Sequence, residues 1–294
     1  MKRLLTTLLL IVMLPSFAKP EDSIADMMRR WNDPAIQQIE AFQIFDNLYY
    51  VGIEWVAAYV IKTNDGLILI DSLYGPWVDH LVEGIVKLGM DPNDIRYVLV
   101  THAHFDHHGG AAEIQAQYGA KVVMTENDWQ LASDSVDAGV LSAPSPKKDV
   151  VARDGEWIQV GSTRVKFVES PGHTTGVLSL EFPVRDGDHE YTAFTLGGAG
   201  LNFTGVPQSE SYVASMKRVQ SFDHIDVSLP NHAVMGQVFE RAKRLKKRTK
   251  EQLHPFVDPK GFHSWISGLL AQGEEKLAAE RAGISADPLQ ELLK

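Results

Sequence analysis

The chain has 294 residues, a formal net charge of −10 at pH 7 and no cysteine. This acidic balance argues against a nucleic-acid partner, because binding to a phosphate backbone needs a basic surface. The absence of cysteine excludes disulfides, thiolate metal ligands and cysteine nucleophiles. One basic run, residues 241–250, is interpreted as the solvated face of a surface helix, with contact to an anionic partner as the alternative.

The first 18 residues have the pattern of a secretory signal. Lys2 and Arg3 precede an apolar stretch at residues 4–14, and small residues follow up to Ala18. We therefore predict cleavage after Ala18, a periplasmic or secreted location and a single domain over residues 19–294. Loss of the two cations would change the net charge from −10 to −12. The apolar stretch is too short for a permanent transmembrane helix, so no stable membrane anchor is expected, and retention as an uncleaved anchor is the alternative.

Strands and helices are expected to alternate along most of the chain. A polar leader occupies residues 27–39. Further along, residues 64–66 read Asn-Asp-Gly, which is a strong turn signal between two strands. The expected strands are 47–52, 57–63, 67–71, 97–101, 121–124, 163–169, 177–182, 191–196 and 226–229, and the expected helices are 78–88, 111–118 and 211–221, with helical sequence to the end.

The two halves of the chain share this strand-rich plan. They predict an α/β fold of two packed sheets with helices outside. The proline-rich segment 143–148 is interpreted as a surface loop within one domain, and a domain linker is the alternative.

Four potential metal ligands follow the expected strand 97–101 within one short turn: His102, His104, Asp106 and His107. Imidazole and carboxylate are the ligands of a catalytic zinc, and four of them exceed what one zinc would take from one turn, so two metals are predicted. In an extended segment His102, His104 and Asp106 would point to one side, and the chain would have to turn at His107. A solvated histidine-rich loop and a structural zinc site are the alternatives.

Two more histidines occupy loops that directly follow expected strands. His173 follows the strand 163–169 in a glycine-containing turn, and His232 follows the strand 226–229. Both are predicted ligands, because a strand end holds a loop ligand rigidly. His108 is expected to support the cluster rather than to bind metal. The remaining histidines are interpreted as ordinary surface or core residues: His80, His189, His224, His254 and His263.

The cluster and its two distant histidines resemble the metallo-β-lactamase superfamily, whose hallmark is His-x-His-x-Asp-His followed by two later histidines. Within it the sequence is most similar to subclass B3, which has a histidine at the position of His107 and no cysteine ligand. The resemblance implies an αββα sandwich of two mixed β-sheets with helices on the outer faces. It further implies that two Zn²⁺ ions bind, one to His102, His104 and His173 and the other to Asp106, His107 and His232, and that Asp106 also orients the nucleophile.

The segment after the strand 191–196 departs from many members of this superfamily. Members that cleave thioesters, lactones or phosphoesters carry a bridging aspartate there, whereas residues 197–200 read Gly-Gly-Ala-Gly. This difference argues against glyoxalase-like, lactonase-like and ribonuclease-like activity. The same residues lack the cysteine or serines of the β-lactamases, so Asn202 is the nearest polar candidate for a substrate contact. The segments 54–56 and 138–146 are candidates for the wall of the site, with Trp55 as the expected apolar contact and plain core packing as its alternative role.

The resemblance implies a zinc-dependent β-lactamase whose small-molecule substrates are penicillins and cephalosporins, with carbapenems as further candidates. In such an enzyme the two zincs generate hydroxide from water, and this hydroxide attacks the β-lactam carbonyl. Hydrolysis of lactones or phosphoesters on the same fold is the main alternative. A zinc-binding protein without catalytic activity is a second alternative. The sequence makes no prediction of oligomeric state.

Overall fold

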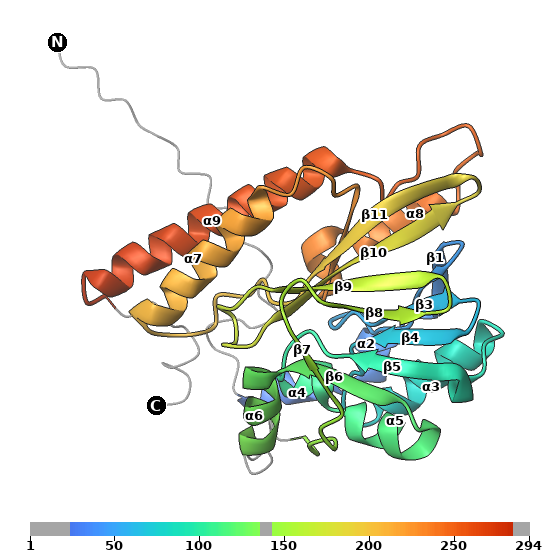
Figure 1. The fold of residues 1–294 in the computed structure, drawn as a ribbon, viewed down its shortest axis with the longest axis horizontal. Helices are drawn as coiled ribbons and strands as arrows, with labels where there is room; N and C mark the ends of the chain where they lie inside the picture. The colour runs from blue at the N-terminus through green and yellow to red at the C-terminus, as the bar shows by residue number, and fades with distance from the viewer. Residues whose placement is uncertain (1–23, 136–142, 285–294) are drawn as a thin grey trace.

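The structure, a computed structural model, describes residues 24–135 and 143–284 (Figure 1). The predicted signal peptide, the start of the predicted mature chain and residues 138–142 of the predicted wall lie outside the described residues. Within the described part of the chain, no helix is both long enough and apolar enough to cross a membrane.

Seven strands form the first sheet in the order of the sequence. Strands β1 to β4 are antiparallel neighbours, and β5, β6 and β7 continue the sheet in parallel. Thr63 pairs with Gly66, so the predicted turn is a hairpin loop of two residues. The strands are β1 (Phe42–Phe45), β2 (Leu48–Tyr50), β3 (Tyr59–Thr63), β4 (Gly66–Ile70), β5 (Ile95–Leu99), β6 (Lys121–Thr125) and β7 (Val150–Ala152).

Five strands form the second sheet, in the order β12, β11, β10, β9, β8. Strands β11 and β12 are parallel, and the other neighbours are antiparallel. The strands are β8 (Trp157–Val160), β9 (Thr163–Glu169), β10 (Leu178–Asp186), β11 (His189–Leu196) and β12 (Val227–Pro230).

Alternation along the strands decides what lies between the sheets. In β3, Tyr59 and Ile61 face the second sheet, and Val60 faces the helices on the other side. Figure 1 shows helices on the outer side of each sheet, so the predicted fold of two mixed sheets with outer helices is confirmed. Side chains of α3 (Trp77–Lys87), α5 (Ala111–Tyr118) and α6 (Glu126–Asp134) cover the first sheet, and side chains of α7 (Val206–Gln220) and α9 (Pro259–Arg281) cover the second.

Several elements differ from the sequence-based expectation. The polar leader contains the helices α1 (Ile24–Trp31) and α2 (Pro34–Gln37), and the short strands β1, β7 and β8 were not predicted. Helix α7 begins at Val206 rather than at residue 211, because Pro207 suits a first helical turn and starts the helix earlier than its apolar spacing suggests. The expected C-terminal helical sequence is divided into α8 (Val238–Leu245) and α9.

Candidate metal centre

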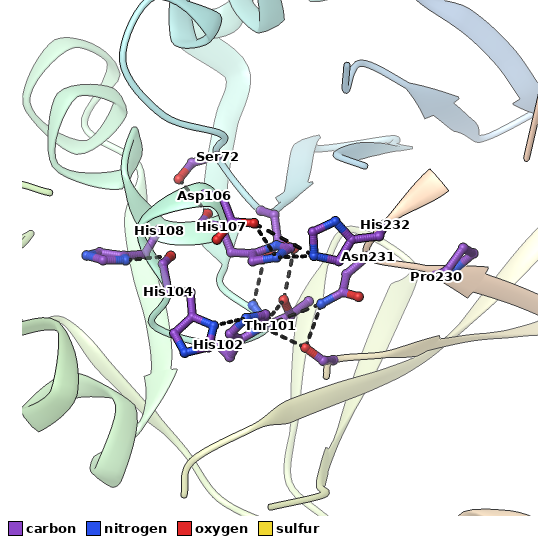
Figure 2. A network of polar contacts seen from close by, with 12 residues as sticks. Ser72, Thr101, His102, His104, Asp106, His107, His108, Pro230, Asn231 and His232 are labelled. Carbon is purple, nitrogen blue, oxygen red and sulfur yellow. Dashed lines mark hydrogen bonds and ion pairs between the residues drawn. The ribbon is translucent and has the colours of Figure 1, made fainter. Parts of the chain in front are cut away.

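The six predicted metal ligands converge at the ends of three strands, although they are spread over 131 positions of the sequence from His102 to His232. His102 and His104 follow β5, and Asp106 and His107 lie in the short helix α4 (Phe105–His108). His173 follows β9 and His232 follows β12. Their side chains form two groups of three, each with ligand atoms within 4.8 Å of one another. Figure 2 shows the clustered side chains of His102, His104, Asp106, His107 and His232.

Group one consists of His102, His104 and His173. Its three facing nitrogens, His102 Nε2, His104 Nδ1 and His173 Nε2, are each 3.1 Å from the other two. His102 Nδ1 donates to the carbonyl of Gly197 at 2.8 Å, and His173 Nδ1 donates to the carbonyl of Gly200 at 2.9 Å. These bonds place the ring protons on Nδ1, so both Nε2 lone pairs point into the group. Nitrogens bound to one tetrahedral zinc would be about 3.3 Å apart, close to this spacing.

Group two consists of Asp106, His107 and His232. Asp106 Oδ2 lies 3.3 Å from His107 Nε2 and 3.7 Å from His232 Nε2, and the two nitrogens are 3.3 Å apart. His107 Nδ1 donates to Asp71 Oδ2 at 2.8 Å, and His232 Nδ1 donates to the carbonyl of Trp55 at 3.2 Å. Again the Nδ1 protons are held from outside, and the Nε2 atoms face the group.

Burial keeps three of these histidines in the neutral form that binds metal, and His107 is the exception. Burial lowers the pKa of His104 to about 3 and those of His173 and His232 to about 4, so these rings are neutral at pH 7. Burial also acts to lower the pKa of His107, but the carboxylates of Asp106 and Asp71 outweigh it and raise that pKa to about 10. A cation in group two would take the place of the proton between His107 and Asp106.

The donor set of both groups fits a divalent metal. Each group offers three nitrogen or oxygen donors from the protein, as a catalytic zinc requires, and leaves a position for water. In group one, two imidazole lone pairs face each other with no proton between them, an arrangement that a bound cation would stabilise.

The expectation from extended geometry was wrong for Asp106. That expectation put Asp106 on the side of His102 and His104, but the structure places it with His107 and His232. The reason is that β5 ends at Leu99 and α4 begins at Phe105, so the two-residue alternation of a strand does not extend to Asp106. The grouping implied by the superfamily resemblance is the one that the structure shows.

Three buried residues that the sequence analysis missed support the two groups. Asp71 accepts hydrogen bonds from His107 and from the backbone and side chain of Thr101. Asp128 Oδ2 accepts from the backbone of Ala103 at 2.9 Å and from the Thr174 hydroxyl at 3.1 Å, which joins the segments of group one. Asn231 Nδ2 donates to the Gly197 carbonyl at 2.8 Å. Asp71 follows the apolar strand β4 directly, and this signal could have identified it.

The other histidines lie outside both groups. His108 is fully buried, and its Nδ1 donates to the backbone carbonyl of His104 at 2.9 Å, which fits the expected supporting role. His80 Nε2 donates to the backbone carbonyl of Ile39, and His254 Nε2 donates to that of Ile44 in β1.

The predicted substrate contacts lie beside the metal groups. Trp55 stacks on Trp31 with ring centroids 4.4 Å apart, and its ring lies 5.4 Å from that of His232. Asn202 is exposed, and a Cβ atom at Gly200 would lie 2.6 Å from its Oδ1. A Cβ atom at Gly198 would meet His173 at 2.7 Å, so close packing against a metal-facing ring requires glycine there.

A family model described as the metallo-β-lactamase superfamily matches residues 55–187, which include five of the six residues of the two groups. The chain carries a metallo-β-lactamase superfamily domain. The subclass B3 metallo-β-lactamase BJP-1 of Bradyrhizobium japonicum has a similar structure, with a TM-score of 0.78 and 29% identity over 87% of this chain and 98% of that one. The metallo-β-lactamase FEZ-1 of Legionella gormanii is also similar in structure, with a TM-score of 0.77 and 29% identity over 85% of this chain and 99% of that one.

Curated relatives of this superfamily domain include hydroxyacylglutathione hydrolases. The protein of Acidiphilium cryptum is 30% identical over 136 residues, which are 46% of this chain and 49% of that protein. The protein of Methylococcus capsulatus is 34% identical over 150 residues, 49% of this chain and 51% of that protein. The chain therefore spans about half the length of these relatives, whereas it spans nearly all of the two β-lactamase structures.

Proposed function

We propose that this metallo-β-lactamase superfamily hydrolase is a zinc-dependent β-lactamase that binds two Zn²⁺ ions and opens the ring of penicillins and cephalosporins. The observation that carries the proposal is the composition of group two: Asp106, His107 and His232, without a cysteine or a bridging carboxylate. This composition is the one that resembles subclass B3. The similarity to BJP-1 and FEZ-1 over nearly their whole length supports the same assignment.

The residues of both groups have distinct tasks in this proposal. When bound, the metals supply Lewis acidity and lower the pKa of water toward neutrality. Asp106 accepts a proton or hydrogen bond from the attacking water and so directs it at the β-lactam carbonyl. Asp71 keeps the Nε2 lone pair of His107 directed into group two. Trp55 presents an apolar surface beside His232, where the substituents of the substrate would pack.

Thioester hydrolysis is the second candidate, since hydroxyacylglutathione hydrolases are among the curated relatives. Two features favour the β-lactamase over it. The relatives match only half of their length. The segment after β11 places Gly198 and Gly200 against His173, where other members of the superfamily carry an aspartate.

A hydrolysis panel tests the proposal directly. The purified chain would be assayed with nitrocefin, a penicillin, a carbapenem, a hydroxyacylglutathione thioester, an acyl-homoserine lactone and a phosphodiester. We expect β-lactam turnover that stops with a chelator and returns with zinc. His232→Ala serves as the control, because it removes one donor of group two. Thioester or lactone cleavage greatly exceeding β-lactam cleavage would refute the assignment, and zinc binding without any turnover would favour a non-enzymatic role.

A further inference from the structure

The loop on one side of group one is bound by a buried tyrosine of α7. Tyr212 is 1% exposed, and its hydroxyl donates to the carbonyl of Ala199 at 2.8 Å. The next residue, Gly200, provides the carbonyl that accepts the Nδ1 proton of His173. The hydroxyl of Tyr212 therefore fixes the peptide unit directly before the one whose carbonyl orients the His173 ring.

The same tyrosine also packs against Gly172, the residue directly before His173. A Cβ atom at Gly172 would lie 2.5 Å from the Cα and Cβ atoms of Tyr212, so the chain entering His173 passes directly over this residue. Tyr212 is thus placed between the two loops that meet at the His173 ring. Its action on group one would run through the backbone at Ala199 and Gly172.

A second buried tyrosine has the corresponding place at group two. Tyr59 of β3 is fully buried, and its hydroxyl donates to the carbonyl of Pro230 at 2.7 Å. Pro230, Asn231 and His232 are consecutive, and Figure 2 shows them leading from β12 to group two. The bond ties the end of the second sheet, which carries His232, to the first sheet.

We propose that Tyr212 and Tyr59 are positioning residues that set the two metal sites independently, Tyr212 through the loops around His173 and Tyr59 through the segment that ends at His232. The proposal rests on the metal sites of the proposed function. Asn231 Nδ2 also donates to the Gly197 carbonyl, which accepts from His102 of group one. The Asn231 side chain makes this bond, and the Pro230 carbonyl takes no part in it, so loss of the Tyr59 hydroxyl leaves the contact with group one in place.

Replacement of either tyrosine by phenylalanine isolates the hydroxyl. The ring and its packing stay, while a buried carbonyl loses its donor and the adjoining loop loses one fixed point. Groups that orient metal ligands typically change metal affinity by about 10- to 100-fold when they are removed. Because these hydroxyls act on the ligands through one or two peptide units, we expect about tenfold weaker zinc binding at the affected site, the low end of that range.

The experiment measures Zn²⁺ affinity of the full chain by competition with a chromophoric chelator. His232→Ala leaves group one as the intact site, and His173→Ala leaves group two. Tyr212→Phe and Tyr59→Phe are each introduced into both backgrounds, so each tyrosine is the matched control for the other. Thermal unfolding of all metal-free variants records whether the fold is kept.

The expected result is selective. Tyr212→Phe weakens zinc binding in the His232→Ala background and leaves it unchanged in the His173→Ala background, and Tyr59→Phe does the reverse. Equal losses in both backgrounds, or no loss in either, would overturn the proposal, because a general effect on the fold lowers both affinities. If the His232→Ala chain bound no zinc at all, the assignment of the metal sites would itself be wrong. That outcome differs from zinc binding in the His232→Ala chain that Tyr212→Phe leaves unchanged, which would contradict only the role of Tyr212.

Discussion

At the scale of single residues, Asp71 shows how a carboxylate outside the metal groups controls one of their members. Its side chain is fully buried, and its backbone has a positive φ of 59°, a region that favours glycine, asparagine and aspartate. Oδ1 accepts from the Thr101 backbone at 2.7 Å, and Oδ2 accepts from the Thr101 hydroxyl and from His107 Nδ1. Both oxygens are therefore used, and the second one determines the tautomer of His107.

We predict that Asp71→Asn lowers the zinc affinity of group two by about 10- to 100-fold. Asparagine tolerates the positive φ, and its carbonyl can still accept from the Thr101 backbone. Its amide would then face His107 Nδ1 as a donor, which favours the tautomer with the proton on Nε2, where the metal should bind. Zinc titration in the His173→Ala background measures the effect.

Asp226→Asn is the matched control for Asp71→Asn. Asp226 also accepts a backbone hydrogen bond, from Thr192 at 2.9 Å, but it belongs to neither metal group. Unchanged affinity in Asp71→Asn would show that the carboxylate does not set the tautomer of His107.

At the scale of elements, the segment between α8 and α9 is held to the edge of the first sheet by a neutral histidine. His254 is 2% exposed, its Nε2 donates to the Ile44 carbonyl in β1 at 2.9 Å, and its Nδ1 accepts from the Phe256 backbone at 3.3 Å. Its ring stacks on Phe45 with centroids 3.9 Å apart. Burial lowers the pKa of His254 to about 4. Protonation would also place an N–H at Nδ1 that faces the backbone N–H of Phe256, so that two donors would oppose each other.

This arrangement predicts a pH dependence of stability. Above pH 6.5 His254 is neutral in both folded and unfolded chains. As the pH falls from 6.5 to about 4, His254 becomes protonated in the unfolded chain but stays neutral in the folded chain. The free energy of unfolding therefore decreases, by up to about 3 kcal/mol. Denaturant unfolding of wild type and His254→Gln across this range should show a shallower decline in the variant. His189→Gln, at an exposed position, is the control, and parallel profiles for all three chains would contradict the prediction.

At the scale of the whole molecule, the metal groups join the two sheets. His102, His104, Asp106 and His107 follow β5 of the first sheet, whereas His173 and His232 follow β9 and β12 of the second. Each group contains one residue from the second sheet. A metal bound to either group would therefore crosslink the sheets at one end of the sandwich.

We predict that removal of the metals lowers the melting temperature by about 10 °C, because zinc at a thousandfold excess over its Kd stabilises the folded chain by about 4 kcal/mol. Thermal unfolding with chelator, and again after zinc is restored, measures the shift and its reversal. The double variant His173→Ala and His232→Ala should lose most of the zinc effect. An unchanged melting temperature after verified metal loss would mean that the metals do not join the sheets.

Much of the fold followed from local patterns. The apolar segments 57–63 and 67–71 indicated β3 and β4, and the Asn-Asp-Gly turn joined them correctly. Short elements were missed: β1 has four residues and β7 has three, too few for a period to be recognised. Their place in the sheet comes from pairing with neighbours, which is a tertiary property.

The sequence by itself determined the chemistry of the site, because His102, His104, Asp106 and His107 lie within six positions and because His173 and His232 follow strands. Only the tertiary structure decided how these residues are divided and held. Asp106 joins His107 because α4 rotates it away from His104, and Asp71, Asp128, Tyr59 and Tyr212 reach the site from separate elements. Ligand identity is a property of residue type and spacing, whereas ligand orientation depends on hydrogen bonds between segments far apart in the chain.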